Sequence, residues 1–422
     1  MLGHACIVAV PDHPETAEVL DSPLFGVRTF SDVLRNPALF PDRKTADLVH
    51  AWTPRENVRK FAMAYLGSAP EARLTIHLED NEAHLSAAFA KLSIDEITAL
   101  GDVESAKRLP ENLSHPLRSK HFLSLAHGVT YITERLREST PSTASSHLLL
   151  PGLSMSEDRD EASVEAERAE LRLKPDEKLI VYTGSTTFAN LADVKCLTLA
   201  VRLLNEAGQP TRLVRTGHQP AEYLAILAEV GGKFVTDLGF IAKDRLPRLL
   251  AAADVLVQPG GTDVFNAYRL PSKLPEFLCA GRPTIMPAAN IGVLIRAGQE
   301  GLLLESPTPQ EIVRRCQEVF TDPELAGRLA RGARTFAQMH FDLGTNTKGL
   351  LKFYQSLATQ PSVFGEHPPA TDDLAVLVDK FDPELGQRVR GLNNEIDELK
   401  QNLSGAEASA ARHAAGARYQ TA

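Results

Sequence analysis

The stretch AYRLPSKLPEFLCAGRP, residues 267–283, gathers cations, a hydroxyl and a carboxylate around the start of an apolar helix. Pro271 favours an extended chain before it, and Ser272 is a residue type that caps helices. The amides of the first turn and the ammonium of Lys273 then form a site for an anion, with Glu276 on the same helix. This pattern predicts a phosphorylated ligand; a capped helix with surface charge is the open alternative.

The composition is that of an ordinary globular protein. The chain has 422 residues, of which 43% are hydrophobic and 23% charged. This length predicts two domains of roughly 150 to 200 residues each. The formal net charge of -9 argues against a nucleic-acid partner, which normally meets a basic face.

The cysteines and the apolar runs bear on location. The four cysteines, Cys6, Cys196, Cys279 and Cys316, lie far apart and form no CxxC motif, which favours reduced thiols and no structural metal. No run approaches the ~20 apolar residues that span a bilayer, and residues 1–14 lack a signal-peptide pattern. We expect a cytoplasmic protein whose membrane contact, if any, is peripheral.

Short apolar runs alternate with helical patterns, first before and again after a charge-rich segment. The predicted strands are 5–10, 46–52, 72–78 and 128–133, then 179–184, 211–217, 233–239, 254–260 and 282–287. The segments 56–66, 323–341 and 347–357 have helical spacing. The sequence therefore predicts an α/β protein with two Rossmann-like domains, each a parallel sheet covered by helices.

These patterns give a predicted domain organisation, together with a short coiled-coil seam marked by Val389, Leu392, Ile396, Leu399 and Leu403. The predicted parts are an N-terminal domain 1–155 completed by a crossover helix at about 341–358, a C-terminal domain 156–340, a linker 359–383 and a terminal segment 384–422 with a coiled coil and a flexible tail.

Glycines follow the predicted strands of the second half. Gly184, Gly217, Gly239 and Gly260 each come directly after an apolar run. Ligands of open α/β sheets bind at the carboxyl ends of the strands, so these glycines favour a shared phosphate site; plain tight turns are the alternative for any single one. The chain has no G-x-G-x-x-G and no P-loop motif, which argues against a dehydrogenase or a P-loop ATPase.

The second half also carries a longer pattern that resembles a known family. From residue 179 to about 357, the order of LIVYTG, LVRTG, the glycines at 260–261 and RLPSKLPEFLCAGRPTI resembles the retaining GT-B glycosyltransferases of the large family four group. The N-terminal half resembles them more weakly, through DLVHAWTP, LTIHLED, GVTYIT and LLLPG. The resemblance implies a donor domain at the C-terminus and an acceptor domain at the N-terminus, facing a cleft.

The resemblance also implies roles for individual residues. Lys273 is expected at the donor diphosphate, and Glu276 matches the second glutamate of the family's E-x7-E motif, which holds the ribose. The first glutamate would fall at Tyr268, a departure from the family pattern. The residues expected to bind the donor are Gly184, Ser185, Asn190, Arg215, Gly217, Asp263, Asn266, Tyr268, Arg269 and Ser272.

On the acceptor side, two polar residues lie at the end of the predicted strand 72–78. His77 and Asp80 are predicted to orient an acceptor hydroxyl, with a structural histidine as the alternative for His77. With Lys273 and Glu276 they make up the predicted catalytic residues. In such chemistry the leaving diphosphate takes the acceptor proton on the same face, so cations and helix amides supply the main transition-state stabilisation.

The resemblance thus implies a metal-independent, retaining hexosyltransferase that moves a sugar from a nucleotide-diphospho-sugar to a glycan, lipid-linked or protein acceptor in glycan biosynthesis. We expect no cofactor besides this donor substrate. A homodimer through residues 384–405 is a further prediction. A catalytically weak GT-B scaffold that binds partners, and a nucleotide-sugar epimerase, are the alternatives.

Overall fold

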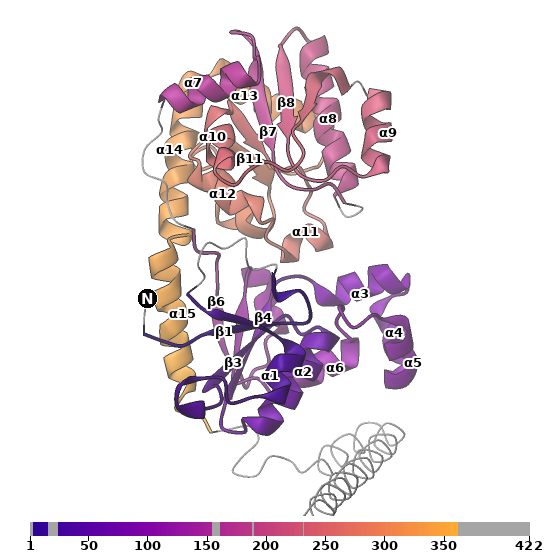
Figure 1. Cartoon of the computed structure of the whole chain (residues 1–422). Helices are drawn as coiled ribbons and strands as arrows, with labels where there is room; N and C mark the ends of the chain where they lie inside the picture. Colours follow the sequence, from indigo (N-terminus) through magenta and orange to yellow (C-terminus); the bar gives the residue numbers. More distant parts are fainter. Residues whose placement is uncertain (1–2, 16–23, 154–160, 188–189, 231, 362–422) are drawn as a thin grey trace, which may run out of the picture. The chain divides into compact units, whose positions relative to one another are not determined.

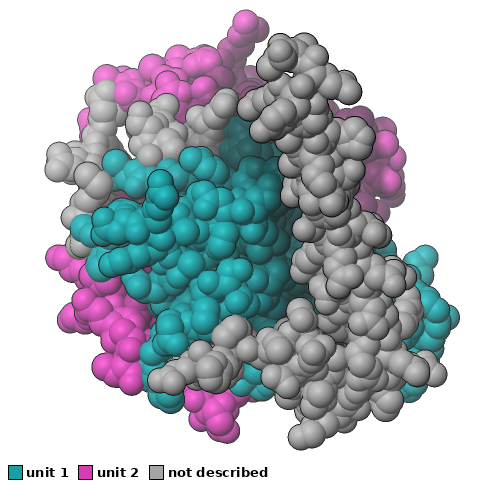
Figure 2. Space-filling view, turned by 60° about the horizontal axis from the view of Figure 1, so that its bottom comes forward, with its two compact units in different colours: residues 1–75, 85–127, 360–422 teal, residues 76–84, 128–359 magenta. Residues whose placement is uncertain are grey.

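The computed structural model of this chain describes residues 3–15, 24–153, 161–187, 190–230 and 232–361. It divides into two compact units, coloured separately in Figure 2. The first unit holds residues 1–75, 85–127 and 360–422, and the second holds 76–84 and 128–359. The predicted coiled coil and tail, 384–422, and the linker from residue 362 lie outside the described residues.

The first unit begins with a parallel pair of strands, β1 (Ile7–Val10) and β2 (Gly26–Thr29). Strand β3 (Leu48–Trp52) follows. The helices of this unit are α1 (Phe30–Arg35), α2 (Glu56–Ser68), α4 (Ile94–Ala99), α5 (Gly101–Arg108) and α6 (Pro116–Ser124). Local signals start several of them: Ser93 and Glu96 form a reciprocal capping box on α4.

A four-stranded sheet has the order β3-β4-β5-β6. Strand β4 (Arg73–Leu78) and helix α3 (Glu82–Ala90) each carry residues of both units. Strands β5 (Gly128–Tyr131) and β6 (Ser145–Leu148) are parallel neighbours in the second unit. The apolar run of β4 is buried on both faces, as expected for a strand inside a sheet covered by helices.

The second unit contains a six-stranded sheet, of which β7, β8 and β11 are labelled in Figure 1. Every neighbouring pair in it is parallel. Its order is β12-β11-β10-β7-β8-β9. The bounds are β7 (Lys178–Tyr182), β8 (Thr211–Arg215), β9 (Val235–Asp237), β10 (Val255–Val257), β11 (Thr284–Pro287) and β12 (Leu302–Leu304). The chain winds outward in opposite directions from β7 and β10, so the topology switches between these two strands.

The second unit contains helices along its length, several of which pack on this sheet or on each other. They are α7 (Glu161–Glu170), α8 (Leu191–Glu206), α9 (Ala221–Val230), α10 (Arg245–Ala252), α11 (Val264–Tyr268), α12 (Lys273–Cys279), α13 (Pro309–Thr321), α14 (Pro323–His340) and α15 (Leu343–Leu357). Helix α8 has an amphipathic pattern. Its apolar residues Val194, Leu197, Val201 and Leu204 recur at helical spacing and are fully buried in the core.

Helix α15 follows α14 and packs on strands β5 and β6. The ring of Phe353 stacks on His147 with 5.2 Å between ring centroids. Gly128 leaves the space that this packing needs, because a Cβ there would lie 2.6 Å from the Phe353 ring. The predicted domain boundaries themselves stay predictions.

The sequence patterns identify most of these elements. Each run predicted to form a strand overlaps one, and the three predicted helical segments overlap α2, α14 and α15. Strands β2, β6 and β12 were not predicted, because they are short and two of them are partly polar. None of the helices in the described segments has both the length and the apolar composition that crossing a bilayer requires.

Helix α14 offers a test of the packing. At Gly332 a Cβ would overlap the Gln299 carbonyl oxygen and lie 2.7 Å from its carbon. We expect Gly332→Ala to lower the free energy of unfolding by about 1–3 kcal/mol, although alanine is the better helix former. At Gly327 on the same helix the nearest atom is the flexible end of Arg331, at 3.3 Å. Gly327→Ala should therefore stabilise the protein by about 0.5–1 kcal/mol in urea unfolding; equal effects at both sites would contradict this packing.

Candidate functional site

The residues predicted to bind the donor gather where the parallel strands of the second unit end. The loop after β7 contains Gly184, and the chain after β10 passes through Gly260 and Asp263 into α11 and α12. These two loops leave the sheet on either side of the switch in strand order. In open α/β sheets this place is the usual ligand crevice.

Lys273 is the first residue of α12, and its side chain is directed to β7. Its Nζ donates a hydrogen bond to the hydroxyl of Tyr182 at 2.9 Å and lies 4.1 Å from the centroid of that ring. Gly184, with φ of 98°, leaves room for this side chain: a Cβ there would lie 3.2 Å from the Cε and Nζ of Lys273. The ammonium is therefore held against the loop after β7.

Burial, together with the nearby guanidinium groups of Arg269 and Arg215, lowers the pKa of Lys273 to about 7. The carboxylates of Asp193 and Glu276 act in the opposite direction. The ammonium thus sits in a field of mixed sign and loses its proton near neutral pH.

A chain of hydrogen bonds holds Arg269. The Oδ1 of Asp263 accepts from the backbone N–H groups of Phe265 and Asn266 at 2.9 and 3.1 Å, and so caps α11. The Asn266 amide donates to Asp263 Oδ2 at 2.7 Å, and its Oδ1 accepts from Arg269 at 3.0 and 3.2 Å. Asp263 and Asn266 therefore position Arg269, whose guanidinium also lies 4.2 Å from the Phe265 ring centroid.

Gly184 and Gly217 bring the loops after β7 and β8 together. Gly217 has φ of 89°, and a Cβ there would lie 2.6 Å from the carbon of Gly184 and from the nitrogen of Ser185. The Ser185 hydroxyl accepts from the His218 N–H at 3.1 Å, and the Gly217 N–H donates to Gly239 at 2.7 Å. Backbone approach on this scale admits only glycine. Binding of phosphate by these loops stays a prediction.

Asn190 and Arg215 have internal contacts. The Asn190 amide donates to the Ser185 carbonyl at 3.1 Å and to the Tyr182 hydroxyl at 3.3 Å. The Arg215 side chain is fully buried, lies 3.2 Å from Asp237 in an ion pair and donates to the His218 carbonyl at 3.0 Å. Both residues brace loops in this structure, and their predicted contact with the donor stays a prediction.

Helix α12 differs from expectation at Ser272, and the predicted role of Glu276 stays a prediction. Ser272 has helical backbone angles and its side chain makes no capping hydrogen bond, so the predicted cap is wrong. The reason is that the turn starts one residue earlier, with the Leu274 N–H donating to Pro271. Among the described residues the Glu276 carboxylate has no hydrogen-bond or ion-pair partner, and burial raises its pKa.

Tyr268 is the last residue of α11 and faces the 3₁₀ turn Glu134–Ser139. Its hydroxyl donates to the Glu138 carboxylate and accepts from Arg135 at 3.3 Å. The Thr133 hydroxyl donates to the Tyr268 carbonyl at 3.1 Å. The position that would hold the first glutamate of the E-x7-E motif is thus occupied by a side chain engaged with this turn. Its predicted donor contact stays a prediction.

The predicted acceptor residues lie in different surroundings. His77 is 1% exposed, and its Nδ1 is 2.8 Å from the Thr130 hydroxyl on β5. Asp80 is half-buried, and its charge acts on Arg269. Burial lowers the pKa of Arg269, and the carboxylates of Asp193 and Asp80 oppose this. The contacts of His77 are those of a structural histidine, and catalytic roles for His77 and Asp80 stay predictions.

Two residues of this site were missed in the sequence. Tyr182 is the last residue of β7 and is fully buried. In the sequence it looks like a core residue, because it ends an apolar run and belongs to no motif. Asp193 lies in the first turn of α8, where acidic residues are common for helix-dipole reasons alone. Burial raises the pKa of Asp193, and the cations Arg269 and Lys273 act against that rise.

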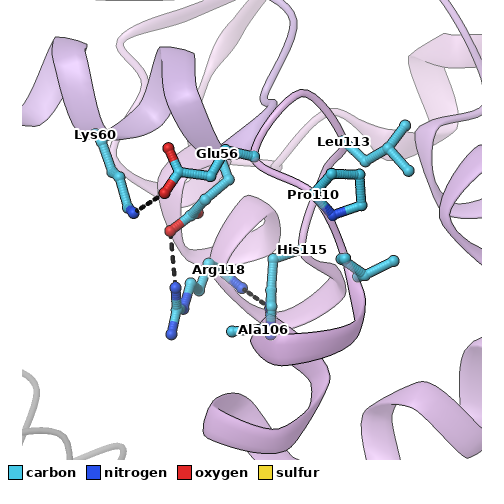
Figure 3. A pocket seen from close by; sticks show the side chains of 9 residues that line it. Glu56, Lys60, Ala106, Pro110, Leu113, His115 and Arg118 are labelled. Carbon is cyan, nitrogen blue, oxygen red and sulfur yellow. Dashed lines mark hydrogen bonds and ion pairs between the residues drawn. The ribbon is translucent and has the colours of Figure 1, made fainter. Parts of the chain in front are cut away.

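A separate recess lies in the first unit and contains none of the predicted donor residues (Figure 3). The Glu56 carboxylate accepts two hydrogen bonds from Arg59 and one from Arg118, each at 2.7 Å. Arg118 also donates two to Asp102, at 2.7 and 2.6 Å. These charged groups pair with one another, so we interpret the side chains that line the recess as a structural ion network.

The Gly184 loop can be tested through Lys273. Gly184→Ala places a methyl group against the lysine Cε and Nζ, so we expect the ammonium to move from Tyr182. Gly208, at the end of α8, also has a positive φ of 79° but has nothing within 4 Å of a Cβ. Both variants should lose about 1–2 kcal/mol from left-handed strain. Only Gly184→Ala should change the Lys273 pKa measured by NMR, and an unchanged pKa would contradict the close packing.

The ion network gives a prediction of pH dependence. The pKa of Glu56 is lowered because the hydrogen bonds and charges of Arg59 and Arg118 outweigh its burial. Its stabilisation is present above the unfolded pKa and is lost as pH falls through the folded pKa. Arg118→Met should cost about 3 kcal/mol at pH 7 and less at pH 3 in urea unfolding. Lys60→Met, which removes an exposed pair with Glu111, should cost less than about 1 kcal/mol at both pH values; equal losses in the two variants would refute this assignment.

Comparison with known proteins agrees with this geometry. Residues 177–322 match the family described as Glycosyl transferases group 1. A D-inositol 3-phosphate glycosyltransferase of Rhodococcus erythropolis is 27% identical over 214 residues, 48% of this chain and 45% of the relative. An alpha-D-kanosaminyltransferase of Streptomyces kanamyceticus is 24% identical over 204 residues, 47% of this chain and 51% of the relative. The chain thus spans about half the length of these curated relatives.

Among solved structures, Anabaena HepE in complex with UDP and glucose superposes with a TM-score of 0.63 at 14% identity. The superposition covers 83% of this chain and 91% of HepE. At this identity the likeness concerns the fold. Residues 177–322 are therefore similar to the Glycosyl transferases group 1 family, and the chain has the GT-B fold.

Proposed function

We propose that this protein transfers a sugar from a nucleotide-diphospho-sugar to a hydroxyl of a glycan, lipid-linked or protein acceptor, with retention and without a metal. One observation carries the proposal: two cations at the switch point of the sheet are held by neutral acceptors. Lys273 donates to the Tyr182 hydroxyl, and Arg269 donates to the Asn266 amide oxygen. Within the described segments neither cation forms an ion pair, so their charge is available to an anion.

The contrast with Arg215 supports this interpretation. Arg215 is fully buried and paired with the Asp237 carboxylate at 3.2 Å. A cation neutralised in this way contributes little to binding a diphosphate. Lys273 and Arg269 instead offer charge at the edge where ligands of such sheets bind. As the bond from the anomeric carbon to the diphosphate breaks, negative charge grows on the leaving group, and these two cations stabilise it.

Glu276 supports a nucleotide rather than a simple phosphate. Its carboxylate is half-buried and, in the described part of the chain, has no hydrogen-bond partner. Such a group gains most from hydroxyl donors. Two ribose hydroxyls meet that requirement. HepE was solved with UDP, which makes UDP the first nucleotide to test.

A second function is favoured by Tyr268. Its hydroxyl is bound to Glu138 and Arg135, where the family motif would supply a carboxylate. A protein that binds the nucleotide without efficient transfer would fit this substitution. Release of UDP from UDP-glucose only when a sugar alcohol acceptor is added would support the transferase. Cytoplasmic location, and a homodimer through residues 384–405, stay predictions.

Calorimetric titration of UDP tests the donor site. Lys273→Met should weaken binding by about 1.5–3 kcal/mol, since it removes a charged donor to the diphosphate. Wild-type Kd should also rise above about pH 7, by up to about tenfold per pH unit, because the free lysine loses its proton with a pKa of about 7 while the diphosphate binds the ammonium. This pH dependence should be absent in Lys273→Met.

Glu276→Gln keeps the size of the side chain and should weaken UDP binding by about tenfold, without the change in pH dependence. Lys60→Met in the first unit serves as the control and should bind as the wild type does. Wild-type UDP affinity in folded Lys273→Met and Glu276→Gln would overturn the assignment of this site. The same titrations with GDP, ADP and CDP identify the preferred base.

A further inference from the structure

Tyr182 holds Lys273 from two directions. It is the last residue of β7 and is fully buried. Its hydroxyl accepts from Lys273 Nζ at 2.9 Å, and the same Nζ lies 4.1 Å from the ring centroid. In the described part of the chain no other group forms a hydrogen bond with this ammonium. One side chain therefore supplies both the acceptor and an aromatic face.

We propose that Tyr182 is the positioning residue for Lys273, a role that rests on the proposed function. Its hydroxyl and ring hold the ammonium against the loop after β7, where the diphosphate of the donor would bind. Tyr182 itself is buried beneath this loop and acts through the lysine rather than by touching the ligand.

The charges around Lys273 explain why such support is needed. Arg269 at the end of α11 and Arg215 at the end of β8 both disfavour the ammonium. Asp193 on α8 and Glu276 on α12 favour it. Neither carboxylate forms a hydrogen bond with Lys273 among the described residues, so charge alone does not fix the position of Nζ. The Tyr182 hydroxyl provides a short directional contact that does.

The hydroxyl has a second bond, which sets its own orientation. The Asn190 amide donates to it at 3.3 Å and also donates to the Ser185 carbonyl at 3.1 Å. Asn190 starts α8, so Tyr182 links Lys273 to the first residues of that helix. Packing of Gly184 against the lysine completes the enclosure. The ammonium is thus held by β7, its loop and the start of α8 together.

Tyr182→Phe separates the two contributions, because it keeps the ring and removes the hydroxyl. A hydrogen bond accepted from the ammonium favours the charged form, so its loss lowers the pKa of Lys273. We expect Tyr182→Phe to bind UDP about tenfold more weakly at pH 7. The rise in Kd with pH should begin at a lower pH than in the wild type. A purely structural hydroxyl would change the melting temperature and leave this pH profile in place.

Tyr65→Phe is the matched control. Tyr65 is a buried tyrosine of the first unit whose hydroxyl also makes two hydrogen bonds, to Ala46 at 2.9 Å and to Pro37 at 3.1 Å. Its loss should lower the melting temperature without moving the pH profile of UDP binding. NMR of lysine labelled at Cε gives the Lys273 pKa directly, with the signal assigned from Lys273→Met.

A double-mutant cycle tests whether Tyr182 acts through Lys273. If Tyr182 acts through Lys273, Tyr182→Phe should have no further effect on UDP affinity in the Lys273→Met background. An unchanged pH profile and lysine pKa in Tyr182→Phe would overturn the inference, even if UDP binding persists and the proposed function stands. If the wild type binds none of UDP, GDP, ADP and CDP, the proposed function falls, and the lysine pKa in Tyr182→Phe still decides whether Tyr182 holds the ammonium.

Discussion

The candidate site depends on the position of β7 inside the six-stranded sheet. This strand pairs with β8 on one edge and with β10 on the other, in parallel register on both. The register places Tyr182 opposite Arg215, so the last residues of β7 and β8 lie side by side. Because the strand order switches between β7 and β10, the loops on the two sides of the switch diverge and leave room at this edge. Arg215 ends β8, and Arg269 and Lys273 lie in the segment that follows β10.

At this edge of the sheet two loops approach closely, and the cations fall into two kinds, paired and unpaired. Gly217 lets its loop approach Gly184 so closely that a Cβ has no space. Arg215 is neutralised by Asp237 and stiffens the loops, whereas Lys273 and Arg269 are held by uncharged oxygens. In the proposed anion site these cations differ in role: the paired one holds the loop, and the unpaired ones are left for the ligand.

Much of the fold could be predicted from the sequence, because buried parallel strands appear as apolar runs and helices as periodic patterns. Strand β6, SSHL, was missed since half of its residues are hydroxyl-bearing. At the site, Lys273 and Glu276 were predicted from a local motif. Tyr182 was not, since its importance comes from a lysine 91 positions away in the chain. The pairing of Arg215 with Asp237 is equally non-local and could not be read from spacing.

The charge state of the site follows from the same burial. Burial lowers the pKa of Lys273 to about 7 and raises those of Glu276 and Asp193. All three shifts disfavour charge, so the free site carries its charges at a cost in free energy. A diphosphate favours the ammonium and disfavours nearby carboxylates, because it is itself an anion. Binding such a ligand therefore recruits protons to these groups. The pKa shifts caused by burial thus couple the affinity for the ligand to pH.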